Sequence, residues 1–207
     1  VIVKEPTPAR AFLRRQEREL GAVCESATPW LIGHTRQATV GPNDKENAHP
    51  FLMGETVGAH NGSVTNHAAL PVDKRKYRLP ECDSAALFAY ADQAGLPTAI
   101  NAAYGSLTLT TSRAPFNKLR VYADWRGSFA AAYLKPLAAV VWASDQEHLL
   151  TALAVAGVEL DKTKEGVSGY LITWPEETLV TLDAASITPL ECSWRLRTLP
   201  KRRSGLT

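Results

Sequence analysis

The fold of this chain is decided by a polar, glycine-containing segment that begins Leu31-Ile32-Gly33-His34-Thr35-Arg36-Gln37-Ala38-Thr39-Val40-Gly41. Three more polar clusters follow it: Asn47-Ala48-His49-Pro50, His60-Asn61-Gly62-Ser63 and Glu81-Cys82-Asp83-Ser84. Each cluster lies next to an apolar run. A hydrophobic core alone requires no such pattern, so the segment indicates a binding or catalytic site held by a folded scaffold.

Together, these clusters supply the chemical groups that recognise an amino acid. Arg36 offers a planar guanidinium for a carboxylate, and Asp83 offers an acceptor for an ammonium group. Asn61 and Gly62 offer a side-chain amide and a backbone N–H as hydrogen-bond donors. Taken singly, these residues have simpler explanations as a surface charge, a helix cap and a turn dipeptide. As an ordered set, they suit an amino-acid substrate whose side-chain carbonyl is attacked.

The bulk composition is that of an ordinary globular domain. The chain has 207 residues, of which 45% are hydrophobic and 21% charged, so it can bury a core. Its net charge of +2 argues against nucleic acid or an anionic membrane as a partner. It has no apolar run of roughly 18 residues, which a membrane-spanning helix needs. Its cysteines Cys24, Cys82 and Cys192 lack the spacing of a disulfide framework. We therefore expect a soluble, cytoplasmic protein with reduced thiols.

Hydrophobic periodicity and turn residues predict an α+β chain. Helices are expected over residues 7–20, 83–94 and, after the capping box Ser144-Asp145-Gln146-Glu147, to about residue 156. Strands are expected at residues 1–3, 31–34, 56–59, 105–111, 119–123, 129–134, 137–143, 167–174 and 179–182. Residues 1–194 are expected to form a single domain, and residues 195–207 a basic C-terminal tail. That tail is either a solvated terminus or a docking site for an acidic partner.

The ordered clusters resemble the signature blocks of class II glutamine amidotransferase domains, which are glutamine-hydrolysing members of the N-terminal nucleophile hydrolase superfamily. Ala143-Ser144-Asp145 resembles a later block of the same family, so the resemblance covers residues 31–156. It implies an αββα four-layer sandwich with two mainly antiparallel sheets. It also implies that the chain is an enzyme, a glutaminase that releases ammonia from glutamine.

The resemblance assigns roles to individual residues. In the family, an N-terminal cysteine attacks the side-chain amide of glutamine while its own α-amine acts as the base. The resemblance implies that the Asn61 amide and the Gly62 N–H bind the oxyanion of the tetrahedral intermediate. Arg36 would bind the substrate α-carboxylate and Asp83 the α-ammonium, which together orient the amide for attack.

Thr39 and His60 are further candidates for the substrate pocket. We expect no cofactor and no metal. The histidines of the segment, His34, His49, His60 and His67, have a spacing that fits no compact metal-ligand motif.

The start of the chain leaves two alternatives open. Val1-Ile2-Val3 resembles the segment that follows the nucleophile in the family, so a cysteine is expected just before Val1. The alternative is a catalytically inactive member of the fold that acts as a structural or binding module. Two more differences from the family concern the pocket wall: the interval between Arg10 and His34 is short, and Gln37 and Val40 stand where some members have Trp and His.

The expected partners follow from the size of the chain and from the resemblance. Glutamine is the expected small-molecule substrate. Within 207 residues we find no room for the synthetase or isomerase domain that consumes the ammonia. The expected partner is therefore either a separate synthetase subunit, which would carry out the acceptor reaction, or further copies of this chain in a homo-oligomer.

Overall fold

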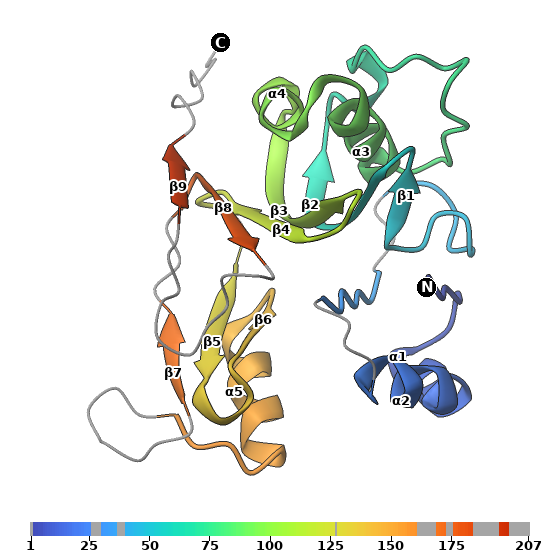
Figure 1. The fold of residues 1–207 in the computed structure, drawn as a ribbon. Coiled ribbons are helices and arrows are strands. Elements are labelled where there is room, and N and C mark those ends of the chain that lie inside the picture. The colour runs from blue at the N-terminus through green and yellow to red at the C-terminus, as the bar shows by residue number, and fades with distance from the viewer. Residues whose placement is uncertain are drawn as a thin grey trace.

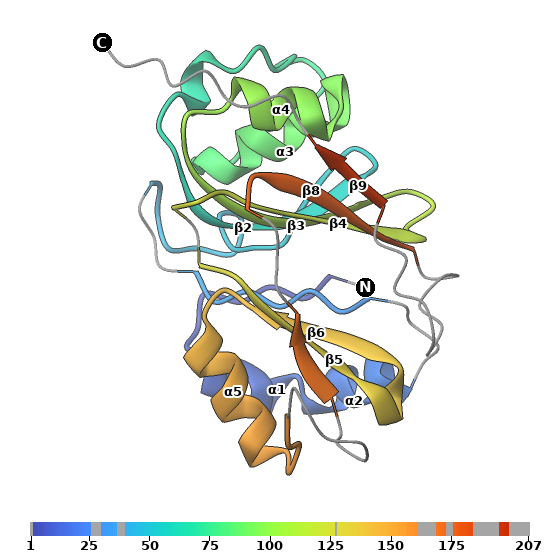
Figure 2. The same cartoon turned by 90° about the vertical axis from the view of Figure 1, so that its left-hand side faces the viewer.

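Two β-sheets that lie face to face form the centre of the fold, and helices lie against their outer faces (Figures 1 and 2). The computed structural model describes residues 2–25, 30–36, 40–126, 128–160, 169–172, 176–183 and 195–198. The larger sheet has the strand order β1-β2-β3-β4-β8-β9, and the smaller sheet has the order β6-β5-β7. All pairs between these strands are antiparallel. This arrangement confirms the αββα sandwich of two mainly antiparallel sheets.

The elements have the following bounds. The larger sheet contains β1 (Phe51–Met53), β2 (Thr56–Val64), β3 (Gly105–Arg113), β4 (Lys118–Ala123), β8 (Thr178–Asp183) and β9 (Arg195–Thr198). The smaller sheet contains β5 (Ala130–Leu134), β6 (Ala139–Ala143) and β7 (Gly169–Ile172). The helices are α1 (Ala9–Arg15), α2 (Glu17–Glu25), α3 (Asp83–Ala94), α4 (Leu96–Ala102) and α5 (Gln146–Val155), with short 3-10 turns at His67–Ala69 and Lys135–Leu137.

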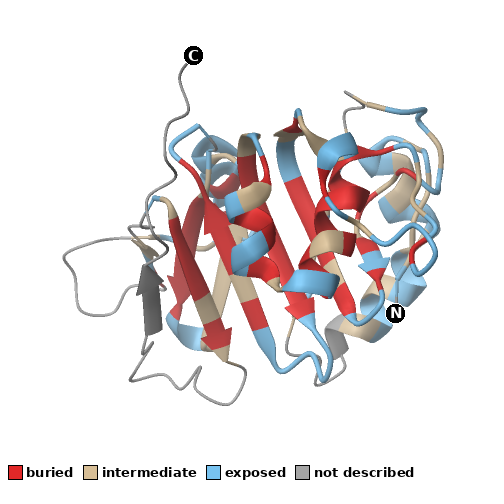
Figure 3. Cartoon of the chain, turned by 90° about the horizontal axis from the view of Figure 1, so that it is seen from above, coloured by how far each residue is buried: buried red, intermediate tan, exposed pale blue. Residues whose placement is uncertain are grey.

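The larger sheet is apolar on both faces, as its place between two layers requires. On β4, Leu119 and Val121 face the smaller sheet, where Trp142 of β6 packs against them. Tyr122 points to the other face and packs with Leu87 of α3. Side chains alternate along a strand, so one strand serves both interfaces. Figure 3 shows buried residues running along the strands. Each fully buried Leu or Val contributes about 1.5–3 kcal/mol to stability.

Helix α3 lies close against β2 because β2 carries a glycine at the crossing point. A Cβ atom at Gly58 would lie 2.3 Å from the ring of Phe88, which is fully buried. Helix α3 begins at Asp83 and ends before Gly95, whose φ of 89° belongs to the left-handed region that favours glycine. This close packing places Asp83 beside the end of β2.

The N-terminal part of the chain differs from the sequence expectation. Val1 lies outside the described residues, residues 2–3 form no strand, and Ile2 is 41% exposed. The expected helix 7–20 is two helices, separated at Gln16, whose side chain donates to Glu5. The Thr7 hydroxyl also donates to Glu5 and so does not cap the helix. Residues 30–36 contain no strand either.

Three other differences arise from pairing and from proline. β2 extends to Val64, because residues 61 and 62 pair with Thr108 and Leu107 of β3 instead of ending the strand. A further helix, α4, follows the expected end of α3, and Pro97 lies in its first turn, where proline is tolerated. Within the expected tail, Arg195–Thr198 form β9 and pair with β8. Among the helices that the structure describes, none has the length and apolar character needed to cross a membrane.

Asp145, rather than Ser144, caps helix α5. The Asp145 carboxylate accepts a hydrogen bond from the His148 N–H at 3.0 Å, so the expected capping box around Ser144 was wrong. Replacing Asp145 with Ala is therefore expected to lower the free energy of unfolding by about 1 kcal/mol. Urea denaturation would measure this change, with Ser144→Ala as the matched control. An equal loss in both variants would contradict the assignment.

Candidate functional site

All four polar clusters meet at the C-terminal half of β2. His34 of the first cluster stacks on His49 of the second, with ring centroids 4.1 Å apart and planes at 15°. The His49 Nδ1 atom accepts a hydrogen bond from the backbone N–H of His60 at 3.1 Å. The His60 ring in turn lies 2.9 Å from the Ser84 hydroxyl, measured from Nδ1 to Oγ. A continuous set of contacts thus joins segments that are as far apart as residues 34 and 84.

Asp83 is held at the junction of α3 and β2. It is only 3% exposed, and its Oδ2 atom accepts the backbone N–H of Val64 at 2.6 Å. Its Oδ1 atom lies 3.4 Å from Ser84 Oγ and 3.6 Å from Cys82 Sγ. Asp83 is also the first residue of α3, at the positive end of the helix dipole.

Arg36 lies near the histidine stack and is half-buried. Its guanidinium donates to the carbonyl of Pro42 at 3.0 Å and also to the carbonyl of Val40. Since a guanidinium has five N–H donors, these two bonds leave capacity for a carboxylate. The positive charge of Arg36 also lowers the pKa of His34 and of His49.

Asn61 and Gly62 are adjacent, exposed residues within β2. Gly62 has a φ of 137°, and a Cβ atom there would lie 2.2 Å from the Ser106 carbonyl oxygen. Only glycine fits this conformation and this close approach of two backbones. Asn61-Gly62 therefore lies within a strand and does not form the turn that its composition suggests.

Of the two remaining pocket candidates, Thr39 and His60, the structure describes His60. Thr39 lies outside the described residues. His60 is 3% exposed, and its ring nitrogens face Ser84 on one side and the Ser106 carbonyl, at 3.1 Å from Nε2, on the other. In this structure the ring is therefore bonded within the protein.

Burial keeps the histidine cluster neutral near pH 7. Burial, with a smaller effect from the neighbouring His60, lowers the pKa of His34 to about 4. Burial lowers the pKa of His49 to about 2, with a smaller effect from the neighbouring His34 ring. The pKa of His60 is also lowered by burial. Neutral rings can stack without electrostatic repulsion, which accounts for the short distance between His34 and His49.

A cavity of about 340 Å³ adjoins the site. Val40 and Gly41, which follow Arg36, form one wall, and Glu81 and Cys82, which precede Asp83, form another. The volume is at the small end for ligand pockets. None of the predicted site residues that the structure describes lines it. The segments that lead to the two predicted clamp residues lie against each other here, because a Cβ atom at Gly41 would lie 1.6 Å from the Glu81 carbonyl oxygen.

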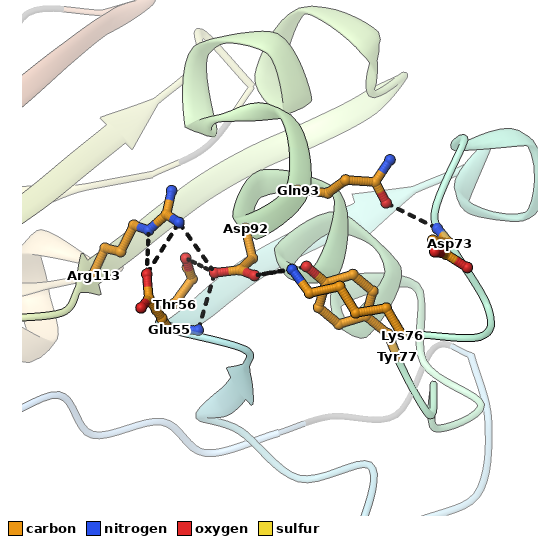
Figure 4. A network of polar contacts seen from close by, with 8 residues as sticks. All are labelled: Glu55, Thr56, Asp73, Lys76, Tyr77, Asp92, Gln93 and Arg113. Atoms are coloured by element: carbon orange, nitrogen blue, oxygen red, sulfur yellow. Dashed lines mark hydrogen bonds and ion pairs between the residues drawn. The ribbon is translucent and has the colours of Figure 1, made fainter.

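A buried carboxylate, Asp92 of α3, anchors the loop that leads into Asp83 (Figure 4). It accepts hydrogen bonds from the Tyr77 hydroxyl at 2.6 Å and from Lys76 at 3.3 Å, both in this loop. It also accepts the backbone N–H of Glu55 at 3.0 Å and the Thr56 hydroxyl at 3.1 Å, at the start of β2. Helix, loop and sheet therefore share one acceptor.

The sequence patterns did not single out Ser84, Ser106 or Asp92. Ser84 follows Asp83 directly, so a functional reading of the last cluster could have included it. Nothing in the local pattern indicates Ser106, because only the register of β3 against β2 brings it to His60. Asp92 is a polar residue in a mostly apolar helix. Its burial and its partners are apparent only from the folded structure.

Comparisons with known proteins show likenesses in sequence and in fold. The chain is 40% identical over 47 residues to glutamine–fructose-6-phosphate aminotransferase (isomerizing) from Wigglesworthia glossinidia brevipalpis, a match that covers 23% of the chain and 8% of that protein. Glutamine phosphoribosylpyrophosphate amidotransferase from B. subtilis, solved with ADP and GMP, superimposes with a TM-score of 0.57 at 14% identity. A structure described as the allosteric regulatory enzyme of purine biosynthesis superimposes with a TM-score of 0.55 at 16% identity. No family model matches the chain.

These matches cover only part of the known proteins. Each superposition covers 81% of the chain but only 34% of the solved chain, so the chain spans about a third of those proteins. At this level of identity the superpositions establish the fold, and the 47-residue match adds a likeness in sequence. The chain has the fold of a class II glutamine amidotransferase domain, of the N-terminal nucleophile type, and resembles that family in sequence.

Proposed function

We propose that this chain is the glutamine-hydrolysing part of a cytoplasmic glutamine amidotransferase. The observation that carries the proposal is the meeting of all four clusters at β2, through the His34–His49 stack and the contacts of His60 and Ser84. The nucleophile is a cysteine directly before Val1. The ammonia is used by a separate synthetase subunit or by an assembly of identical chains.

The proposed reaction needs two binding functions from the described residues. Arg36 binds the α-carboxylate of glutamine with the donors that its loop carbonyls leave free, and Asp83 binds the α-ammonium. Asn61 and Gly62 donate to the oxyanion. The exposure of both residues, next to the buried acid–histidine contacts, supports this role.

The chemistry then proceeds in two steps. The cysteine thiol gives its proton to the α-amine as its sulfur bonds to the side-chain carbon of glutamine. The tetrahedral intermediate collapses, its carbon–nitrogen bond breaks, and the α-ammonium returns the proton to the leaving nitrogen, which departs as ammonia. Water attacks the resulting thioester, which releases glutamate and restores the thiol.

Replacing Asn61 with Ala is expected to lower kcat for glutamine hydrolysis roughly 10²-fold with little change in KM, because an oxyanion donor acts mainly in the transition state. Glutamate release by the full-length protein, with its N-terminal cysteine, would measure this. Asn101→Ala is the matched control, since Asn101 is an exposed residue of α4, and its kcat should not change. An unchanged kcat in the Asn61 variant would contradict the proposed role.

A second function, a non-catalytic binding or structural module, is favoured by one observation. The Arg36 guanidinium and the Asp83 carboxylate each already bond to the protein itself. Intact-mass spectrometry of the natural protein separates the two functions. A mature N-terminal cysteine, together with glutamate release, supports the enzyme, whereas a mature chain that begins at Val1 supports the module.

A further inference from the structure

We propose that His60 and Ser84 act as positioning residues that decide whether Asp83 has an oxygen available for the ammonium group of an amino-acid substrate. This inference rests on the proposed function. It assigns to His60 a role through Asp83 and not by direct contact with the substrate. It also adds Ser84, which the sequence analysis did not single out.

The surroundings of His60 determine which ring nitrogen carries the hydrogen. Nε2 lies 3.1 Å from the carbonyl oxygen of Ser106, and a carbonyl can only accept a hydrogen bond. Nε2 must therefore be the protonated nitrogen of the neutral ring, which leaves Nδ1 as an acceptor. The Ser84 hydroxyl, 2.9 Å away, donates to it.

Ser84 has a single hydroxyl hydrogen but two acceptors within reach. Its Oγ atom lies 2.9 Å from His60 Nδ1 and 3.4 Å from Asp83 Oδ1. While the hydrogen is directed to His60, the donor that the described residues direct to Asp83 Oδ1 is the weak thiol of Cys82, at 3.6 Å. The other oxygen, Oδ2, already accepts the Val64 N–H at 2.6 Å. Oδ1 is therefore the less engaged oxygen and the better acceptor for an ammonium N–H.

Protonation of the His60 ring reverses this arrangement. An imidazolium donates from both nitrogens, so Nδ1–H now donates to the Ser84 oxygen. The Ser84 hydrogen must turn away from the ring, and Asp83 Oδ1 is the acceptor that it meets. Asp83 then has a hydrogen bond on each oxygen and a positive charge nearby. Both effects weaken its attraction for a substrate ammonium group.

The charged and titratable groups around His60 come from several elements. Burial has the largest effect and favours the neutral ring, whereas the Ser106 carbonyl, Asp83 and Asp124 favour the charged ring, so the pKa of His60 is lowered overall. The groups are Asp83 of α3, Asp124 after β4, His49 and His34 of the two earlier clusters, Arg36, and Lys4 near the N-terminus. The ring is thus neutral at pH 7 and takes up a proton in acid. Substrate affinity should therefore fall as the pH falls.

The test is the pH dependence of L-glutamine binding to the full-length protein, measured by isothermal titration calorimetry from pH 8 down to the lowest pH at which the protein stays folded. For the wild type we expect a loss of affinity of about tenfold on the acid side, the size expected for one hydrogen bond to a charged group. His60→Asn places a non-titrating amide near the position of Nδ1, and Ser84→Ala removes the shared hydrogen. Both variants should lose much less affinity than the wild type on the acid side, each measured against its own affinity at pH 8.

The control and a second readout separate this inference from the proposed function. His148→Asn, at an exposed position on α5, should keep the wild-type pH profile. If the variants lose as much affinity for glutamine in acid as the wild type does, the role of His60 and Ser84 is overturned, while the proposed function stands. Absence of glutamine binding at every pH would overturn the proposed function. ¹⁵N NMR of the His60 ring at pH 7 should show a hydrogen on Nε2, and a hydrogen on Nδ1 instead would overturn the inference whatever the binding result.

Discussion

Replacing Asp92 with Ala is expected to lower the free energy of unfolding by about 3–5 kcal/mol, because it removes the shared acceptor of a buried hydrogen-bond network. Asp92 is 5% exposed and is the shared acceptor for Tyr77, Thr56 and the Glu55 N–H. Burial raises the pKa of its carboxyl, but these hydrogen bonds outweigh burial and hold the pKa below its usual value. Without the carboxylate, buried donors would lose their partner, and each would cost about 1–3 kcal/mol.

Glu55 provides a matched control for this experiment. Its carboxylate is an acidic partner of Arg113, at 3.1 Å, but is 64% exposed. Glu55→Ala is therefore expected to cost no more than about 1 kcal/mol. Asp92→Asn should fall between the two, because an amide keeps only one acceptor oxygen. Urea denaturation monitored by circular dichroism would measure all three, and equal losses for Asp92→Ala and Glu55→Ala would contradict the network as a source of stability.

Acidification is expected to destabilise the protein strongly between pH 6.5 and pH 4 because of the histidine stack. Burial lowers the pKa of His34 to about 4 and that of His49 to about 2, from 6.5. Below pH 6.5 the unfolded chain therefore binds protons that the folded chain does not. Stability is fully present above pH 6.5 and is lost as the pH falls. One such ring accounts for about 3 kcal/mol by pH 4, at 1.36 kcal/mol per pH unit.

The contribution of the stack can be separated from that of other titrating groups. In His49→Asn, the free energy of unfolding should depend less steeply on pH, by about 1.4 kcal/mol per pH unit over this range. An amide in place of the ring can still accept the His60 N–H. His148→Asn should keep the wild-type slope, since His148 has an 84% exposed side chain. Denaturation series at several pH values would measure the slopes, and a wild-type slope in the His49 variant would show that the stack does not govern acid stability.

Much of the fold could be predicted from local sequence patterns. The helix that begins at Asp83, the helix after Asp145 and most central strands were expected close to their observed bounds. These elements are long and strongly patterned, and their ends carry residues with a direct local effect, such as Gly95. The four-layer arrangement came from the family resemblance, which the superposed structures confirm. The roles of Arg36, Asn61 and Asp83, and the division at residue 194, stay predictions.

Some of the differences share one cause: the outcome depended on a partner distant in sequence. His60-Asn61-Gly62 was expected at the end of a strand, but pairing with β3 continues β2 through it to Val64. Residues 31–34 were expected to form a strand but have no strand partner in the described structure. β9 lies within the expected tail, and its pairing with β8 could not be read from its basic composition.

By itself, the sequence determined which groups are available: the order of the four polar clusters, the glycine at position 62 and the acid at the start of α3. Only the tertiary structure decided how these groups are used. The stack of His34 on His49, the Ser84 hydroxyl between His60 and Asp83, and the shared acceptor Asp92 all depend on contacts between separate elements. The physical reason is that burial and hydrogen-bond partners, which set protonation and orientation, are properties of the packed layers and not of any local stretch of chain.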